Sequence, residues 1–96
     1  MSPINKKKLK KLRQRLDKLD DSFIYLVKKR TKLVKEVLKL KQYKNEIVDK
    51  KRIKIILAQI RKKSIKNNID PKIPNRIWKN MIMSYINYER RNFKKK

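Results

Sequence analysis

The fold is decided by residues 9–41, which read LKKLRQRLDKLDDSFIYLVKKRTKLVKEVLKLK. Their apolar positions recur in alternating steps of three and four, which is the heptad pattern of a helix that packs along another helix. The seam defined by this pattern consists of Leu9, Leu12, Leu16, Leu19, Phe23, Leu26, Arg30, Leu33, Val37 and Leu40. No proline interrupts the stretch, so it predicts one continuous helix about 50 Å long at 1.5 Å per residue.

Two shorter helices are predicted after the long one. Residues 42–46 are polar and predict a loop, and residues 48–66 carry a second apolar stripe at helical spacing. Residues 67–71, Asn-Asn-Ile-Asp-Pro, predict a turn, because asparagine suits the end of a helix and proline stops its extension. A third helix is predicted over residues 74–92.

These elements predict an all-α fold with three helices per subunit, one long and two shorter. Two short helices alone cannot cover the whole seam of the long one. We therefore predict an intertwined helical homodimer, in which two long helices pack against each other. The chain has neither an internal repeat nor a linker, so we expect a single domain over residues 1–96, with residues 1–8 and 93–96 frayed.

The composition excludes several classes of function. The chain has no glycine, cysteine or histidine. This rules out glycine-rich phosphate loops, zinc sites built on Cys or His, and nucleophile–histidine pairs, and we predict no metal site. No apolar run approaches the length of a membrane span, and the N-terminus lacks the features of a signal peptide. We therefore expect a cytoplasmic protein with no membrane partner.

The charge of the chain admits two interpretations. The formal net charge is +24, from 32 Lys and Arg against 8 Asp and Glu. This balance suits a polyanionic partner, nucleic acid first. The alternative is compositional drift, because abundant Lys, Ile and Asn without Gly are expected from an A+T-rich coding sequence. We favour drift over a functional nucleic-acid surface, since net charge governs solubility and association more than fold.

Arg30 is the most informative residue of the seam, because it is charged at a position where the heptad pattern predicts an apolar side chain. A buried arginine must be paired or must meet an anion. The positions one turn away are apolar and offer no acid: Leu26, Val27, Leu33 and Val34. Two structural alternatives remain open, namely an acid from another helix and an extension of the long side chain into solvent.

Further polar residues lie on or beside the apolar stripes. Arg13 and Lys41 belong to a second stripe of the long helix, and Lys41 lies about 16 Å from Arg30 along the axis. Lys41 and Arg30 could therefore bracket one small anionic ligand, whereas Arg13 could reach the site of the other subunit in an antiparallel dimer. Taken singly, Arg13 and Lys41 suit solvated charges better.

The two shorter helices carry polar residues of their own. Asp49 and Arg52 are one turn apart and could form a surface ion pair. Glu89 follows Tyr85 by one turn at the end of the third stripe, where the structural alternative is a solvated carboxylate.

The order and spacing of these residues resemble the all-helical chorismate mutases over about residues 9–90. The motifs are Leu12-Arg13-x-x-Leu16-Asp17-x-Leu19-Asp20, Leu26-x-x-x-Arg30, Val37-x-x-x-Lys41, Ile47-x-Asp49-x-x-Arg52, Asp70-Pro71 with Ile77-Trp78, and Tyr85-x-x-x-Glu89. Each motif is short, and their specificity comes from their order and spacing together.

The resemblance implies an intertwined dimer that converts chorismate to prephenate by a Claisen rearrangement, without cofactor, metal or covalent intermediate. It implies that Arg30 and the other subunit's Arg13 bind the two carboxylates of the substrate. Lys41 and Glu89 would contact the ether oxygen. The remaining positions, Asp49, Arg52 and Tyr85, would lie near the ring hydroxyl and a carboxylate.

The chain departs from the family pattern at two positions. Tyr85 stands where the family often has serine, and Ile53 stands where it often has an acid, so we expect the ring-hydroxyl contacts to differ from the family pattern. Some members carry glutamine at the position of Glu89. Because an ether oxygen only accepts hydrogen bonds, Glu89 must be protonated to donate one, and we expect burial to favour that form.

Three other functions remain as alternatives. Isochorismate-pyruvate lyase shares the fold and the anion-binding arginines. A basic helical nucleic-acid-binding protein would cluster arginines on an exposed face, yet only 8 of the 32 basic residues are Arg, and three of them occupy motif positions. A purely structural coiled-coil dimer would leave Arg30 unexplained.

Overall fold

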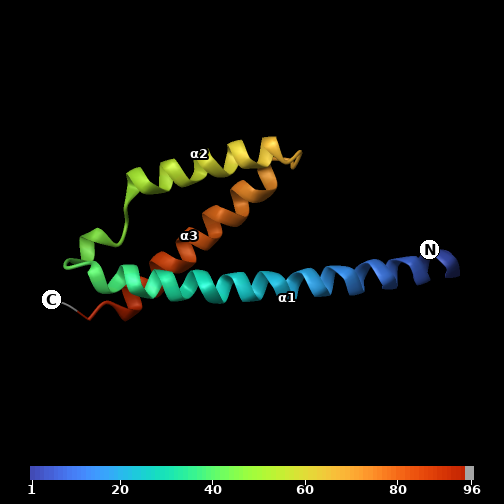
Figure 1. Ribbon diagram of the computed structural model, residues 1–96, viewed down its shortest axis with the longest axis horizontal. Helices are drawn as coiled ribbons and strands as arrows, with labels where there is room; N and C mark the ends of the chain where they lie inside the picture. Colours follow the sequence, from blue (N-terminus) through green and yellow to red (C-terminus); the bar gives the residue numbers. More distant parts are fainter. Residues whose placement is uncertain (95–96) are drawn as a thin grey trace. The chain divides into compact units, whose positions relative to one another are not determined.

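The computed structural model describes residues 1–94 and contains three α-helices (Figure 1). These are α1 (Pro3–Leu40), α2 (Lys50–Lys66) and α3 (Lys72–Asn92), and a short 3-10 turn, η1 (Lys44–Glu46), follows α1. The described residues contain no strand. The all-α fold with one long and two shorter helices is therefore confirmed.

Helix α1 begins earlier than the sequence pattern predicts. The backbone N–H of Asn5 donates a hydrogen bond to Ser2 Oγ at 3.2 Å, so Ser2 caps the helix, and Pro3 occupies its first position. Proline suits that position because its fixed φ is helical and the missing N–H would have no partner there. Residues 3–8, which we expected to be frayed, are consequently helical. The expectation for residues 95 and 96 lies outside the described residues.

The boundaries of the two shorter helices also differ from prediction by two residues. Helix α2 begins at Lys50 instead of residue 48, because Asp49 adopts an extended conformation and caps the helix. Helix α3 begins at Lys72, two residues before Pro74, with the Lys72 N–H bonded to Asp70 Oδ1 at 3.0 Å. Pro74 thus lies in the first turn, where a backbone N–H has no helical partner to lose.

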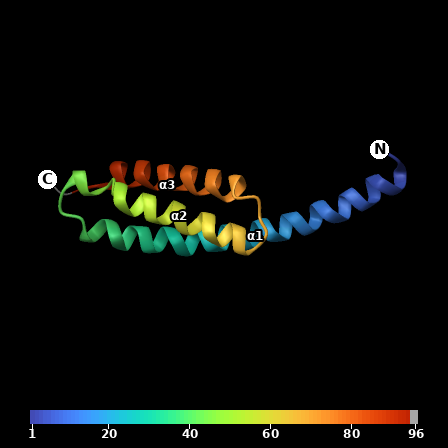
Figure 2. The ribbon, with the colours of Figure 1, turned by 90° about the horizontal axis from the view of Figure 1, so that it is seen from above.

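The turn between α2 and α3 follows the prediction closely. Asn67 ends α2, and Asn68 adopts the left-handed conformation with φ of 57°. Asparagine is one of the few residues other than glycine that adopts this conformation readily. The chain therefore reverses without glycine, and α2 and α3 pack as an antiparallel pair (Figures 1 and 2).

The chain divides into two compact units, Met1–Val34 and Lys35–Lys96. The first unit contains the larger part of α1. The second contains the last turns of α1 together with η1, α2 and α3. The single domain expected from the sequence stays a prediction.

The core of the second unit is small. Its buried apolar residues are Ile47, Ile60 and Ile86, which are 4%, 9% and 8% exposed. Two polar residues, Ser64 and Glu89, are buried beside them. The hydroxyl of Ser64 donates to the Ile60 carbonyl at 2.6 Å, which satisfies its hydrogen-bonding capacity within α2. Glu89 requires a partner from elsewhere in the chain.

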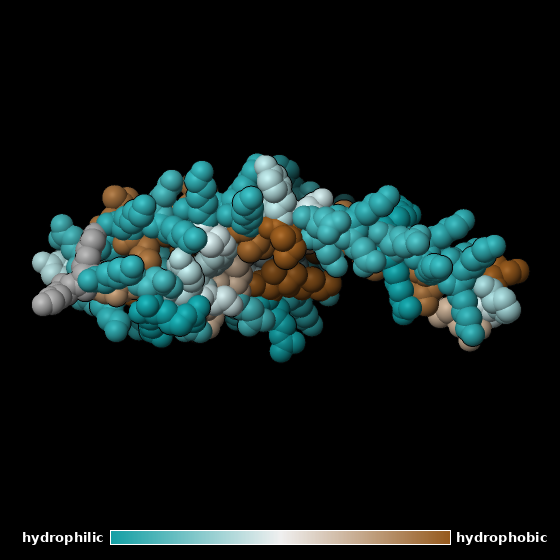
Figure 3. Space-filling view, turned by 90° about the horizontal axis from the view of Figure 1, so that it is seen from below, coloured by the Kyte–Doolittle hydropathy of each residue, from teal (hydrophilic) through white to brown (hydrophobic). Residues whose placement is uncertain are grey.

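Helix α1 has no buried residue, although its seam is apolar. Leu19, Leu26 and Leu33 in the seam are 60%, 59% and 61% exposed. On the face shown in Figure 3, apolar side chains gather in patches among predominantly hydrophilic ones. An exposed apolar stripe of this length marks an interaction surface, because solvation of so much apolar area is unfavourable.

Candidate active site

An ion pair between Lys41 and Glu89 is the central polar feature of the second unit. Lys41 follows directly after α1, and Glu89 belongs to the C-terminal part of α3. Lys41 Nζ lies 2.8 Å from Glu89 Oε2, and their side chains are only 17% and 7% exposed. Charges removed from water to this extent must be compensated. The structure thus brings together two predicted catalytic residues that are 48 positions apart in sequence.

The Lys41 ammonium is also held by the backbone. It donates a second hydrogen bond to the carbonyl oxygen of Ile47 at 3.4 Å. Ile47 is the most buried apolar residue of the core, so its carbonyl is fixed in position. The Lys41 side chain is therefore held from two sides, by a carboxylate and by a backbone carbonyl.

Ile47 is not among the site residues predicted from the sequence. Its contribution comes from the backbone carbonyl, which every residue type possesses. One feature of the sequence could have indicated this position: Ile47 is an apolar residue directly after the polar segment 42–46. Its side chain anchors the connection between α1 and α2 in the core and thereby positions the carbonyl beside Lys41.

Asp49 caps α2 and also lies at the edge of the site. Its Oδ1 accepts a hydrogen bond from the backbone N–H of Arg52 at 3.0 Å. The surface ion pair that the sequence allowed between Asp49 and Arg52 is thus replaced by a contact with the Arg52 backbone. This places a carboxylate at the positive end of the α2 dipole, which is its favoured position.

The capping contact yields a prediction about stability. We expect Asp49→Ala to lower the free energy of unfolding by about 1 kcal/mol, because an N-terminal N–H of α2 loses its acceptor. Asp49→Asn retains an oxygen acceptor at this position and serves as the matched control. Urea unfolding followed by circular dichroism measures both variants. Equal destabilisation by the two substitutions would contradict the capping role.

An open depression of about 730 Å³ connects Lys41 with Asp49. Its lining consists of Lys41, Asn45, Glu46, Val48, Asp49, Lys50 and Lys51. Glu46 is oriented by a hydrogen bond from the Tyr43 backbone N–H to its Oε1 at 3.3 Å. Three lysines and two carboxylates line the depression, and one of these lysines, Lys41, is paired with Glu89.

The other two predicted residues of this unit lie on its shorter helices. Tyr85 is half-buried on α3, one turn before Glu89, so its ring lies on the same side of the helix as the ion pair. Arg52 is exposed in the first turn of α2. Both positions are compatible with the predicted contacts, which stay predictions.

Arg13 and Arg30 belong to the first unit. Arg30 is exposed, as are its seam neighbours Leu26 and Leu33. The charge in the seam is therefore solvated in the single chain and needs no acidic partner there. Arg13 lines an open depression with Met1, Lys6, Leu9, Lys10, Gln14 and Asp17. The role of both arginines in the site stays a prediction.

Two kinds of feature are absent from residues 1–94. Residues 1–94 contain no group of three or more acidic, His or Cys side chains that could hold a metal ion. Among the helices of the same residues, none is both long and apolar enough to cross a membrane.

Comparison with known protein families identifies the class of this chain. Residues 12–90 match the family model of chorismate mutase type II. Neither the comparison with curated proteins nor that with solved structures gives a match. Because the matched segment covers most of the chain, the protein belongs to the chorismate mutase type II family, whose members are all-helical isomerases.

Proposed function

We propose that the protein converts chorismate to prephenate by a Claisen rearrangement, in the biosynthesis of phenylalanine and tyrosine. The observation that carries the proposal is the buried Lys41–Glu89 pair, in a chain of the chorismate mutase type II family. The reaction is intramolecular and requires no proton transfer, so a chain without histidine can catalyse it. We propose catalysis by electrostatic stabilisation and by control of substrate conformation, without a cofactor.

Two arginines hold the substrate in this proposal. Chorismate is a dianion, and each of its carboxylates suits the planar fork of a guanidinium. Arg30 binds one carboxylate, and Arg13 of the other subunit binds the second. Fixing both ends keeps the substrate in a folded conformer with its reacting carbon atoms close together, which removes part of the activation barrier.

Lys41 and Glu89 act on the ether oxygen in the proposed mechanism. As the C–O bond breaks, partial negative charge develops on this oxygen. An ammonium already held by the Ile47 carbonyl and by Glu89 needs little reorganisation to stabilise that charge. We assign Glu89 to the same oxygen; it accepts the hydrogen bond of Lys41 in the chain without substrate, and it can donate one to the ether oxygen only as the carboxylic acid. Both contacts strengthen in the transition state, so they raise the rate of the chemical step.

Asp49, Arg52 and Tyr85 complete the proposed substrate contacts. Asp49 borders the depression beside Lys41, and we assign it to the ring hydroxyl. Arg52 follows it by one turn, and we assign it to a carboxylate. Tyr85 lies one turn before Glu89 and offers a hydroxyl that can donate or accept.

The proposed site requires a homodimer, because Arg13 must come from a second chain. The exposed apolar seam of α1 supports this assembly. We predict that sedimentation equilibrium gives twice the chain mass at micromolar concentration, since burying the seam stabilises the pair. The measurement is repeated in high salt, which screens the repulsion between highly charged chains. A folded monomer under both conditions would exclude the shared site.

An assay on the purified protein tests the proposed reaction. Chorismate disappearance is followed at saturating substrate, and the product is identified as prephenate. A parallel assay with isochorismate, in which pyruvate is measured, tests the lyase of the same fold. Prephenate formation with no pyruvate release supports the proposal, whereas turnover of isochorismate alone overturns it.

The role of Glu89 yields a prediction about hydrogen bonding. The amide of Glu89→Gln can accept a hydrogen bond from Lys41 and donate one to the ether oxygen, so we expect this variant to keep kcat within about tenfold of the native value. Glu89→Ala loses both contacts, and its kcat should fall by about 10²-fold or more. Steady-state kinetics of the native protein and of both variants is the measurement. Equal kcat values for the two variants would contradict the assignment of Glu89 to the ether oxygen. The cytoplasmic location stays a prediction from the sequence.

A further inference from the structure

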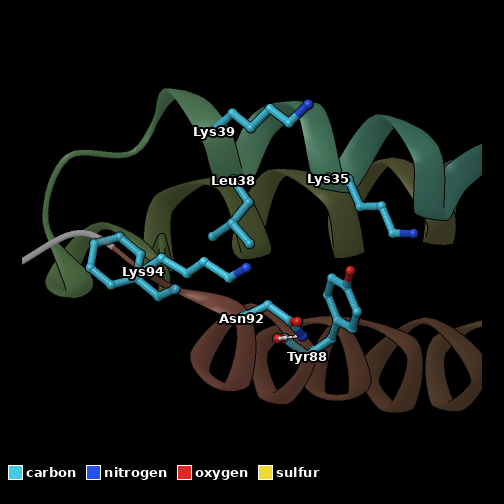
Figure 4. A pocket seen from close by; sticks show the side chains of 7 residues that line it. Lys35, Leu38, Lys39, Tyr88, Asn92 and Lys94 are labelled. Atoms are coloured by element: carbon cyan, nitrogen blue, oxygen red, sulfur yellow. Dashed lines mark hydrogen bonds between the residues drawn. The ribbon is translucent and has the colours of Figure 1, made fainter.

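A second cavity, of about 380 Å³, lies between the last turns of α1 and the C-terminal end of α3 (Figure 4). Its lining consists of Lys35, Leu38, Lys39, Tyr88, Asn92, Phe93 and Lys94. Cavities that bind small molecules in proteins are typically about 300–1,000 Å³ in volume. All seven residues belong to the second unit, and none of them lines the depression beside Lys41 and Asp49. The cavity is therefore separate from the candidate active site.

The interior of this cavity is apolar and aromatic. Leu38, Tyr88 and Phe93 are half-buried. Figure 4 shows the Leu38 side chain directed from α1 into the space between the helices, and the Tyr88 hydroxyl directed toward α1. Asn92 Nδ2 donates to the Tyr88 carbonyl at 2.8 Å, which fixes the amide at the end of α3. A flat apolar group can lie among these side chains.

The rim of the cavity is cationic. In Figure 4 the ammonium group of Lys94 points into the space between Leu38 and Asn92, and Lys35 lies beside the Tyr88 hydroxyl. The Lys39 side chain runs along the side of α1 that faces away from α3. None of the lining residues is acidic. An anion at this rim would meet two ammonium groups and no carboxylate.

We propose that this cavity binds a small carboxylate with an aromatic body. The aromatic body packs against Leu38, Tyr88 and Phe93, and the carboxylate meets Lys94 and Lys35. An apolar lining with a few convergent charged groups is the usual composition of a ligand site. The site is independent of the proposed mutase reaction, since it shares no residue with it.

The test is a titration of the full chain with 3-phenylpropionate, followed by amide NMR shifts. We expect saturable shifts centred on Tyr88, Asn92 and Phe93, with a dissociation constant on the order of 1 mM. Propionate, which lacks the ring, and 3-phenylpropanamide, which lacks the charge, should bind at least about fivefold more weakly. Equal binding of either compound would overturn the proposal, because both halves of the ligand are required.

Matched charge variants distinguish the cavity from general attraction by a cationic protein. Lys35→Gln with Lys94→Gln should weaken 3-phenylpropionate binding about five- to tenfold, since both ammonium groups at the rim are lost. The control is Lys72→Gln with Lys79→Gln, which removes the same charge from exposed positions of α3 outside the cavity. Equal weakening in both pairs would overturn the proposal. Shifts centred on Lys41 and Glu89 would place the ligand in the candidate active site and would also overturn it.

Discussion

Arg30→Ala should abolish nearly all mutase turnover while the protein stays helical and dimeric. The substitution removes a guanidinium that we place on a substrate carboxylate, and loss of one partner from such a desolvated pair costs about 2–5 kcal/mol. We therefore expect kcat/KM to fall by roughly 30-fold to several thousand-fold at 1.4 kcal/mol per factor of ten. The fold should be unaffected, because Arg30 is exposed in the chain and alanine is the best helix former.

Two controls define the Arg30 experiment. Arg30→Lys keeps the charge but loses the planar fork, so we expect activity between those of Arg30→Ala and the native protein. Arg15→Ala removes an exposed arginine of the same helix outside the seam and should leave activity unchanged. Steady-state kinetics, circular dichroism and sedimentation are measured on each variant. Full activity of Arg30→Ala would show that the site has been assigned to the wrong residue.

Replacement of Lys41 should have an effect of similar size on the chemical step. We expect Lys41→Met to lower kcat by about 10²–10³-fold, the range found when a preorganised group that stabilises developing negative charge is removed. KM should change much less, because the contact with the ether oxygen strengthens only in the transition state.

Lys41→Met alone also affects the fold, because it leaves Glu89 buried without its cation. Breaking a buried pair in this way destabilises a protein by about 3–5 kcal/mol. The double variant Lys41→Met with Glu89→Gln removes both charges, so we expect it to regain most of the stability but none of the activity. Urea unfolding and kcat are measured on the native protein and on both variants. Recovery of activity together with stability would mean that Lys41 has only a structural role.

Local patterns in the sequence predicted the helices of this protein and the turn between α2 and α3. Apolar spacing in residues 9–41 predicted the long helix, and the Asn-Asn-Ile-Asp-Pro segment predicted the turn before α3. Helix periodicity is a property of neighbouring residues, so it can be read without knowledge of the fold. The ends of the helices were harder to predict from the sequence, because capping by Ser2 and Asp49 depends on the backbone conformation of single residues.

The sequence by itself determined three helices, the seam of α1 with Arg30 in it, and the spacing that resembles the chorismate mutases. Three further features were decided only by the tertiary structure. Lys41 forms an ion pair with Glu89, the Ile47 carbonyl accepts a hydrogen bond from Lys41, and the seam of α1 is exposed in a single chain. The physical reason is that periodicity identifies which face of a helix is apolar, but not which face of another helix it meets. Contacts between residues 48 positions apart follow from the packing of α3 against the end of α1.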